Sequence, residues 1–478
     1  MPQNQWKNHI KEQIAHPIHI YEPDDLTELK AIIKKAVKSK TRIKAVGSGH
    51  SWSDVCLTTG YLIKPNKLDQ PLELRTELLK PRVKTKFLVE VESGITIEKL
   101  NRYLDKRELA LPNMGGYDGQ TIVGATATST HGSGIKYGPL CDMIQSLDMI
   151  AGNCHHYRIE PQIGPTDPVA YKRKYGTKRS LVQDDDWFYS CLVSVGCLGI
   201  VYSVILKVAE RRFMKEVRQV TDWPKVKAKL RRGLVDKHTH FEILVNPYTV
   251  NRKRIVLTTV REKFSGRRPH KKDLKRNFLV EFGSKIVQVG DLYKLVFKDP
   301  TKSPKLIERT IKGLEDKSYV GRSFDVYNIG EANHIPSYSA EIALPMKNDK
   351  YLDAVENLFV EVAKLRKDGL YLSGAFVLRF VKKSKAYLSP MFNRDTCMVE
   401  IILLKGNPGA KEIYRRLEMA MKPFGARMHW GQFNFLTSDK VKKDYPKFNE
   451  WKKVSAILNP DGIFNNEFSD RVGLSYYS

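Results

Sequence analysis

The stretch "VGSGHSWSD", residues 46–54, places glycines and serines around a single histidine, His50. A strand-like run, "RIKA", comes just before it, and another, "VCLTTGYLI", begins directly after it. Glycine permits positive φ and serine hydroxyls bond back to the backbone, so the stretch is suited to a tight turn. Backbone N–H groups in such a turn also form a concave surface that binds phosphate. Taken alone, the stretch is compatible with a purely structural turn and with a phosphate site.

The chain is strongly basic, with 81 Lys and Arg against 53 Asp and Glu and a formal net charge of +28. This excess favours contact with nucleic acid, anionic lipid or anionic ligands, although a solvated lysine-rich surface has the same composition. The densest basic run is "REKFSGRRPHKKDLKR", residues 261–276. It lacks the interleaved aromatic residues of a single-strand-binding surface, so nucleic acid is not an expected partner. We expect an exposed loop that contacts an anionic membrane surface.

Cysteine usage and apolar runs bear on the location of the protein. The six cysteines form no Cys-x-x-Cys pair, which disfavours a metal site or a disulfide scaffold and fits a reducing compartment. The first residues lack the apolar core of a signal peptide. The most apolar run, residues 191–206, is too short and too rich in glycine to span a membrane. The sequence predicts a protein that is cytoplasmic or peripheral to a membrane, without a metal site.

At 478 residues the chain is too long for one ordinary core, so two or three domains are expected. The pattern of residues 22–40 predicts an amphipathic helix capped by Asp24 or Asp25, and residues 87–109 predict strand, turn and helix. Residues 112–134 are mostly small and can bury little side-chain area. Close approach of this backbone to a large ligand is the physical reason for such a composition.

The sequence pattern changes beyond about residue 210. Strand-like runs such as "HFEILVNP", "KRIVLTTV", "SAEIALP" and "CMVEIILLKG" alternate there with lysine-rich helical stretches, which predicts a second α+β domain. Near its end the chain has a helical stretch that is stopped by "NPDG", residues 459–462.

Six segments, in the same order along the chain, carry a resemblance to a known family. They are "RIKAVGSGHSWSD" (42–54), "GGYDGQTIVGATATSTHGSGIKYG" (115–138), "VSVGCLGIVYSVILKV" (193–208), "LRFVKKSKAYLSPMFNRDTC" (378–397), "RMHWGQFNF" (427–435) and "ILNPDGIFNNEF" (457–468). Together they resemble the FAD-dependent oxidoreductases of the vanillyl-alcohol oxidase class. Within that class the chain is most similar to the L-gulonolactone, D-arabinonolactone and alditol oxidases.

The resemblance implies an α+β fold in two parts. A PCMH-type FAD-binding domain would comprise residues 1–210 and be completed by residues 426–478. A cap domain, residues 211–425, would contain an antiparallel sheet and form the substrate pocket. No G-x-G-x-x-G fingerprint led by a strand is present, so the dinucleotide-binding fold that uses it is not expected.

The resemblance also assigns the glycine-rich stretches to FAD. The opening turn would hold the pyrophosphate, the second stretch would lie against the flavin and its phosphates, and the third would pack on the adenine side. His50 matches a position whose imidazole is often bonded covalently to the flavin, whereas His131 is expected to be a structural, hydrogen-bonding residue. The assigned residues are Gly47, Ser48, Gly49, His50, Ser51, Gly115, Gly116, Gly124, Ser129, Thr130, Gly132, Gly199, Ile200 and Val201.

The sequence departs from the family at the expected catalytic groups. Relatives commonly have a Glu-x-Arg pair on one cap strand; here Arg379 is kept, but Val377 stands at the glutamate position. The lysine of the family's "HWGK" is replaced by Gln432. Two of the usual polar groups are therefore missing.

A compensating carboxylate is visible in the neighbouring apolar run, residues 397–404, where Glu400 is the single charged residue. A lone buried carboxylate is costly unless it is paired, and Arg379 is isolated in the same way in its own strand. We therefore expect Glu400 and Arg379 to form the catalytic pair, with Glu400 as proton acceptor. His429 and Gln432 would help to bind the substrate or the flavin edge. The alternative is a structural ion pair far from the flavin.

The resemblance implies removal of hydride from a carbon that bears a hydroxyl, with delivery to flavin N5 and molecular oxygen as the acceptor. The expected substrate is sugar-like: an aldonolactone, an alditol or a related polyol. Two alternatives stay open at this point. One is a flavin dehydrogenase of a bulkier alcohol with another acceptor, and the other is a flavin-holding protein without turnover that docks on a membrane.

Overall fold

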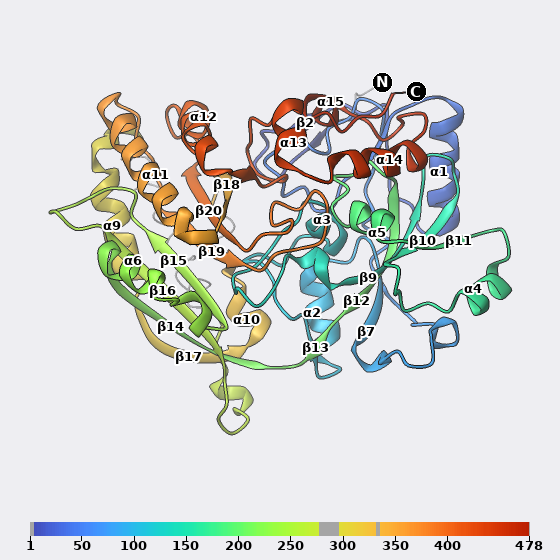
Figure 1. Cartoon of the computed structure of the whole chain (residues 1–478), viewed down its shortest axis with the longest axis horizontal. Coiled ribbons are helices and arrows are strands. Elements are labelled where there is room, and N and C mark those ends of the chain that lie inside the picture. Colours follow the sequence, from blue (N-terminus) through green and yellow to red (C-terminus); the bar gives the residue numbers. More distant parts are fainter. Residues whose placement is uncertain (1–3, 277–295, 331–334, 478) are drawn as a thin grey trace.

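The computed structural model describes residues 4–276, 296–330 and 335–477. Two halves lie side by side in Figure 1, one built on a six-stranded sheet and one on an eight-stranded sheet. The chain forms the first half, crosses into the second, and then returns to the first for its last helices. The predicted combination of helices and sheets, with an antiparallel sheet after residue 210, is confirmed.

The first half contains a mixed sheet in the order β11-β10-β9-β12-β7-β6. Its strands are β6 Pro71–Leu72, β7 Leu88–Glu92, β9 Ile144–Ile150, β10 His156–Glu160, β11 Ser180–Gln183 and β12 Ile200–Lys207. A separate parallel sheet consists of β3 His19–Tyr21, β4 Ile43–Ala45 and β5 Tyr61–Ile63. Two short antiparallel pairs are β1 Trp6–Lys7 with β2 Ile14–Ala15, and β8 Leu109–Ala110 with β13 Ala209–Glu210.

Helices from both ends of the chain cover these sheets. They are α1 Leu26–Lys38, α2 Ile97–Asp105, α3 Ile122–Ala127, α4 Pro168–Tyr175, α5 Asp185–Leu192, α13 Ser438–Asp444, α14 Phe448–Leu458 and α15 Glu467–Arg471. Helix α14 packs against α5. The buried face of α1 shares a core with Ile463 and Phe464, so the returning segment completes the first half.

The second half is an antiparallel sheet in the order β17-β14-β16-β15-β19-β20-β18-β21. Its strands are β14 Phe213–Asp222, β15 His240–Val245, β16 Ile255–Lys263, β17 Asp316–Arg322, β18 Ser337–Pro345, β19 Phe376–Val381, β20 Thr396–Leu404 and β21 Arg427–Met428. Its helices are α6 Trp223–Arg231, α9 Ser303–Gly313, α10 Ser323–Tyr327, α11 Lys350–Lys367 and α12 Ala410–Ala420.

The two faces of the eight-stranded sheet differ in chemistry. Side chains alternate along a strand, so Phe376 and Phe380 of β19 point to one face while Arg379 points to the other. The phenylalanine face is apolar and packs on α11, where the Phe376 ring lies parallel to that of Phe359, 6.2 Å away. The Arg379 face is directed toward the first half, and it contains the polar residues of the site described below.

Most local sequence predictions agree with the structure. Helix α1 forms within residues 22–40, and Asp25 caps it by accepting the Glu28 N–H at 2.8 Å. Strand β7 and helix α2 form the predicted strand, turn and helix. Helix α14 ends just before the "NPDG" stretch, as predicted.

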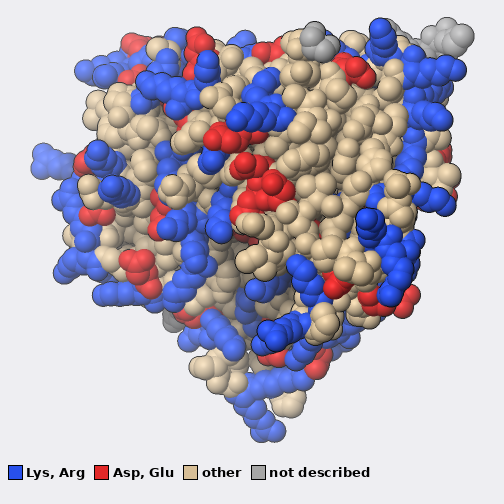
Figure 2. Space-filling model, turned by 45° about the vertical axis from the view of Figure 1, so that its right-hand side comes forward, with Lys and Arg blue, Asp and Glu red and all other residues tan. Residues whose placement is uncertain are grey.

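The prediction for the basic run, residues 261–276, is only partly right. Its first residues belong to β16, and Arg261 is buried because its Nε donates to Glu216 Oε2 at 2.6 Å. The exposed loop therefore begins at residue 264. It forms the yellow-green projection at the bottom of Figure 1, and the lower tip of the molecule is covered mainly by Lys and Arg in Figure 2. Within the described ranges, no helix is long and apolar enough to cross a membrane.

A buried ion network stabilises the six-stranded sheet. Arg158 donates from Nε to Asp148 at 2.8 Å and from Nη2 to Glu90 at 3.0 Å. His156 Nε2 lies 3.0 Å from the same aspartate. All four side chains are at most 8% exposed, so the network depends on the neutralising guanidinium.

We predict that Arg158→Met lowers the free energy of unfolding by about 3–5 kcal/mol, because it leaves two buried carboxylates without their cation. Arg102→Met is the matched control, since the Arg102–Glu98 pair is 72% and 49% exposed and exposed pairs contribute less than about 1 kcal/mol. Urea unfolding of both variants measures the difference. Equal losses of stability would contradict this role of Arg158.

Candidate functional site

Two adjoining cavities form a continuous trough between the two halves of the molecule. The smaller has a volume of about 130 Å³ and lies in the first half; the larger, of about 390 Å³, is bounded by the eight-stranded sheet. The cavities share the lining residues His50, Ser51, Gln120 and Thr128. The histidine of the opening turn therefore lies where the two cavities meet.

Close packing explains the glycines of the opening turn. A Cβ at Gly47 would collide with the hydroxyl of Thr121, which caps α3. Gly49 has φ +72°, a conformation that favours glycine, and a Cβ there would lie 3.1 Å from the Trp6 ring. The turn is also held from the side, because Ser48 Oγ donates to the Gly119 carbonyl at 2.6 Å. The backbone is thus fixed against the cavity without a side chain in between.

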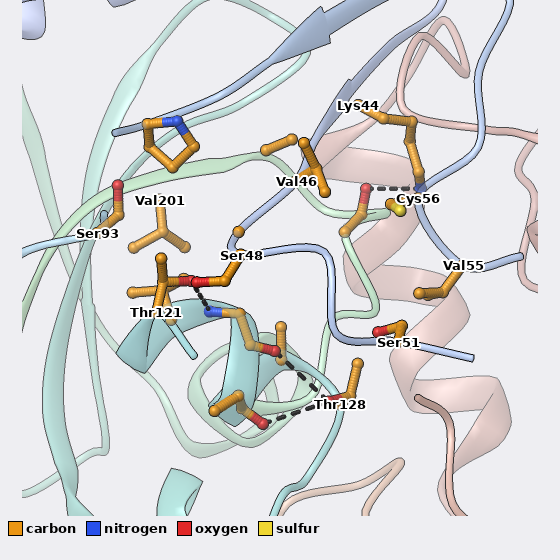
Figure 3. Close-up of a pocket in the computed structure, with 18 of the residues that line it drawn as sticks. Lys44, Val46, Ser48, Ser51, Val55, Cys56, Ser93, Thr121, Thr128 and Val201 are labelled. Carbon is orange, nitrogen blue, oxygen red and sulfur yellow. Dashed lines mark hydrogen bonds between the residues drawn. The ribbon is translucent and has the colours of Figure 1, made fainter. Parts of the chain in front are cut away.

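Figure 3 shows how the smaller cavity is lined by several segments of the first half. Thr121 and Thr128 lie at the two ends of α3, opposite Val46 and Ser48 of the turn, and Val201 comes from β12. Lys44 lies at the far side, where its Nζ donates to the carbonyls of Gly196, at 3.0 Å, and Phe464, at 3.1 Å. Both the β12 side and the returning C-terminal segment are therefore tied to the strand before the turn.

The structure brings most of the residues assigned to FAD to this trough. The smaller cavity is lined by Gly47, Ser48, Gly49, His50, Ser51, Gly124, Gly199, Ile200 and Val201, and the larger by His50, Ser51, Gly115, Gly116 and Thr130. Ser129 and Gly132 line neither cavity. Ser129 bonds to Ser389 at 2.8 Å, and a Cβ at Gly132 would strike the Met114 carbonyl, so both residues are packed behind the lining.

The His50 ring is held between two other rings. The His9 ring stacks on it at 4.3 Å with an interplanar angle of 20°, and the Tyr117 ring lies 4.2 Å away on a tilted plane. Burial lowers the pKa of His9, although its contact with the Gly49 carbonyl at 3.2 Å opposes this effect. Sequence analysis missed both His9 and Tyr117, which lie 41 and 67 positions from His50 along the chain.

At the polar end of the larger cavity, Arg379 is surrounded by carboxylates. Its Nη1 lies 2.6 Å from Glu400 and 3.6 Å from Glu341, and its Nε donates to Glu242 at 3.1 Å. Burial alone would lower the pKa of Arg379, but the three carboxylates raise it above its usual range. The pairing of Glu400 with Arg379 that the sequence predicts is therefore present, within a larger cluster.

Strand register explains the shape of this cluster. Glu242 lies directly opposite Arg379 on β15, whereas Glu400 lies opposite both Val377 on β19 and Glu341 on β18. Like charges directly opposite each other destabilise a sheet. Arg379, diagonal to Glu400, supplies the positive charge that this pair of carboxylates requires. Ser339 Oγ donates to Glu400 Oε1 at 2.9 Å and fixes the orientation of the carboxylate.

A second carboxylate of the cluster contacts histidine. Glu341 is 4% exposed, and its Oε2 lies 3.2 Å from His131 Nε2. Burial alone would raise the pKa of Glu341, but its neighbours, His131 first, lower it below the usual range. His131 therefore forms a hydrogen bond, as expected, and it also lines the larger cavity.

His429 and Gln432 lie on the segment that follows β21. Burial lowers the pKa of His429 to about 4, and its Nδ1 accepts the Gly431 N–H at 3.1 Å, so the imidazole is neutral near pH 7. The Gln432 N–H donates to the His429 carbonyl at 3.2 Å. Gln432 Oε1 is buried and has no hydrogen-bond partner among the residues that the structure describes. Both side chains line the larger cavity.

The trough fits FAD in its chemistry and its layout. The smaller cavity offers glycine backbone and hydroxyls for a pyrophosphate, and β12 supplies an apolar wall for an adenine. The larger cavity begins at His50 and ends in a charged cluster, so a flavin ring at the junction would adjoin titratable groups. The residues that would hold FAD are those of the glycine turn, α3 and β12.

Comparison with known proteins identifies the class. Residues 17–160 match the family described as FAD binding domain. Cholesterol oxidase from B. sterolicum has a similar structure, with a TM-score of 0.77 at 15% sequence identity over 98% of this chain and 96% of that one. The fold is that of a PCMH-type FAD-binding protein with an α+β cap, and the chain is an FAD-dependent oxidoreductase that acts on CH–OH groups.

The relatives define the family more closely. Residues 204–472 match the family described as D-arabinono-1,4-lactone oxidase, and the chain belongs to this family. It is 26% identical to L-gulono-1,4-lactone dehydrogenase of Mycobacterium tuberculosis and 25% identical to L-gulonolactone oxidase of Mus musculus, in both cases over 98% of each chain.

Proposed function

We propose that the protein oxidises a hydroxyl of a sugar-like substrate, an aldonolactone or a related polyol, with molecular oxygen as the electron acceptor. The names of the relatives support this substrate class. The observation that carries the proposal is the carboxylate cluster around Arg379. This cluster lines the larger cavity, which adjoins the smaller cavity at His50. A cluster of this kind can hold a substrate oxygen and remove its proton.

Several residues in and beside the cluster have proposed tasks. FAD held by the glycine turn, α3 and β12 would supply the acceptor for the hydride of the carbon that bears the hydroxyl. Arg379 orients the substrate oxygen and stabilises the negative charge that develops on it. Glu400 accepts the hydroxyl proton, and the Ser339 hydroxyl keeps its carboxylate in place. His429 and Gln432 contact the substrate from the segment beside Glu341, the imidazole as a neutral group.

Glu400→Gln tests the proton acceptor. Removal of a general base typically slows a reaction by about 10²–10⁴-fold, so anaerobic reduction of the bound flavin by a verified substrate should slow by that order. FAD content and unfolding temperature should stay near those of the wild type. Glu242→Gln is the control, because it removes an equal charge from Arg379 and leaves the proposed base intact. Equal reduction rates in the two variants would contradict the role of Glu400.

We further propose that FAD is bonded covalently to His50, which lies where the two cavities meet and is held between two rings. The purified protein should keep its yellow colour in the polypeptide after acid precipitation. His50→Ala should release the colour or yield apoprotein. His155→Ala, in the first half but outside both cavities, is the control and should keep the bound flavin. Wild-type flavin that washes out on denaturation would contradict the bond, although not FAD binding.

Oxygen as acceptor can be tested at Gly115, which matches a family position beside the flavin edge. A Cβ there would lie 3.3 Å from the His131 carbonyl and 3.7 Å from Thr130, so alanine fits after a small shift. Gly115→Ala should slow the reaction of the reduced enzyme with oxygen and spare its anaerobic reduction. Gly116→Ala, whose Cβ would contact Ile329 at 3.4 Å, is the control. Slow reoxidation of the wild type by air would instead favour a dehydrogenase with another acceptor.

We also propose peripheral contact with anionic membranes through the basic loop, residues 264–276. Its exposed cations project from the molecule (Figure 2). Binding to phosphatidylserine vesicles should fall steeply with salt, because exposed charges are screened within about 10 Å at 0.1 M. Lys271→Glu with Lys272→Glu should abolish binding, whereas Lys34→Glu with Lys38→Glu on α1 should not. Equal binding by both double variants would contradict a specific role for the loop.

A further inference from the structure

The larger cavity changes from polar to apolar along the strands of the eight-stranded sheet. Register places Arg379, Glu242 and Thr259 side by side on β19, β15 and β16. Two positions further along the same strands, Val377, Leu244 and Leu257 also lie side by side, and all six line the cavity. On β19, β15 and β16 this apolar row lies two residues, about 6.8 Å, from the row of Arg379. On β20 and β18 the apolar row is continued by Glu400 and Glu341, so it adjoins the charged cluster directly.

Helix α9 forms the opposite wall of this apolar end. It packs on β16, the strand that carries Leu257. Its cavity-lining residues are mostly aliphatic: Leu306, Ile307, Thr310 and Ile311. Ile402 and Leu404 of β20 continue the same wall beyond Glu400. The far end of the cavity is therefore enclosed by branched aliphatic side chains from several elements.

Two hydroxyls of the described residues lie at this end, and each makes one hydrogen bond to a backbone group. Thr310 Oγ1 donates to the Leu306 carbonyl at 3.0 Å within α9. Ser373 Oγ accepts the Leu404 N–H at 2.9 Å. A substrate hydroxyl placed here would exchange its water for the remaining hydrogen-bonding capacity of these two hydroxyls, within a lining that is otherwise mostly aliphatic among the described residues, and incomplete replacement of the water costs free energy. An alkyl group in the same place would gain about 0.8 kcal/mol for each buried CH₂.

We infer that the substrate is amphiphilic: a polyol or lactone head that reacts at the Arg379 cluster and an alkyl substituent that lies between α9 and the row of Leu244, Leu257 and Val377. This inference rests on the proposed function for the polar head alone. It distinguishes the protein's substrate from an unsubstituted sugar lactone, in which every carbon carries an oxygen.

Calorimetry of the holoenzyme with alkyl β-D-glucosides, in the absence of oxygen, tests the inference without requiring turnover. The dissociation constant should fall about fourfold for each added CH₂ from methyl to hexyl glucoside. Equal dissociation constants for the methyl and hexyl compounds would overturn the inference.

Two variants of α9 test whether the alkyl chain binds against this helix. Leu306→Asn should raise the dissociation constant of hexyl glucoside about tenfold or more relative to that of methyl glucoside. Thr310→Val should lower the dissociation constant of hexyl glucoside. Misfolding cannot produce such an increase in affinity. Arg309→Ala, on the exposed side of α9, is the control and should change neither constant. Two results together would contradict binding of the alkyl chain against α9. They are a Thr310→Val protein that binds hexyl glucoside no more tightly, and a Leu306→Asn protein in which the ratio of the hexyl to the methyl glucoside dissociation constant is unchanged.

Turnover assays keep the two proposals apart. Oxidation of aldonolactones by a protein whose glucoside affinity is independent of chain length would support the proposed function and overturn this inference. Chain-length dependence in a protein that oxidises neither lactones nor polyols would support the apolar subsite and contradict the proposed function.

Discussion

One buried guanidinium determines the arrangement of the site. Glu341 and Glu400 face each other directly across β18 and β20, a pairing that would repel without a cation nearby. Arg379 contacts both and also bonds Glu242 on its other side, so a single positive charge joins three strands. Loss of Arg379 would leave these carboxylates without their cation, which is strongly destabilising, so the arrangement of the cluster depends on this one guanidinium.

The strand that carries Arg379 is also the link between the two halves. The Gly134 N–H, at the end of the glycine-rich stretch, donates to the Phe380 carbonyl of β19 at 2.7 Å. The residues on either side of this contact, His131 and Arg379, both line the larger cavity. A shift of the cap relative to the FAD-binding half would thus move the charged cluster away from the trough. Main-chain contact, and not only side-chain packing, keeps the cluster against the cofactor site.

Sequence patterns predicted the features that depend on residues close together in the chain. Helix α1, its Asp25 cap and the cap strands follow from periodicity, and the Glu400–Arg379 pair follows from the cost of a lone buried charge. The same lone-charge pattern marks Glu242 and Glu341, but whether they share a face with Arg379 depends on the strand order β15-β19-β20-β18. That order is set by long-range pairing. The wall formed by α9 was missed for a similar reason, since an amphipathic helix does not specify the sheet it covers.

The departures from the family pattern have a single structural consequence. Val377 stands where relatives have the glutamate of the Glu-x-Arg pair, and it belongs to the apolar row of the larger cavity. The carboxylate lies instead on the adjoining strand, at Glu400, directly opposite Val377 in register. Moving the charge one strand across leaves β19, β15 and β16 free to present a continuous aliphatic surface. The proton acceptor that we propose at Glu400 and the apolar subsite that we infer beside Val377 are therefore compatible with each other, since the two residues lie on neighbouring strands.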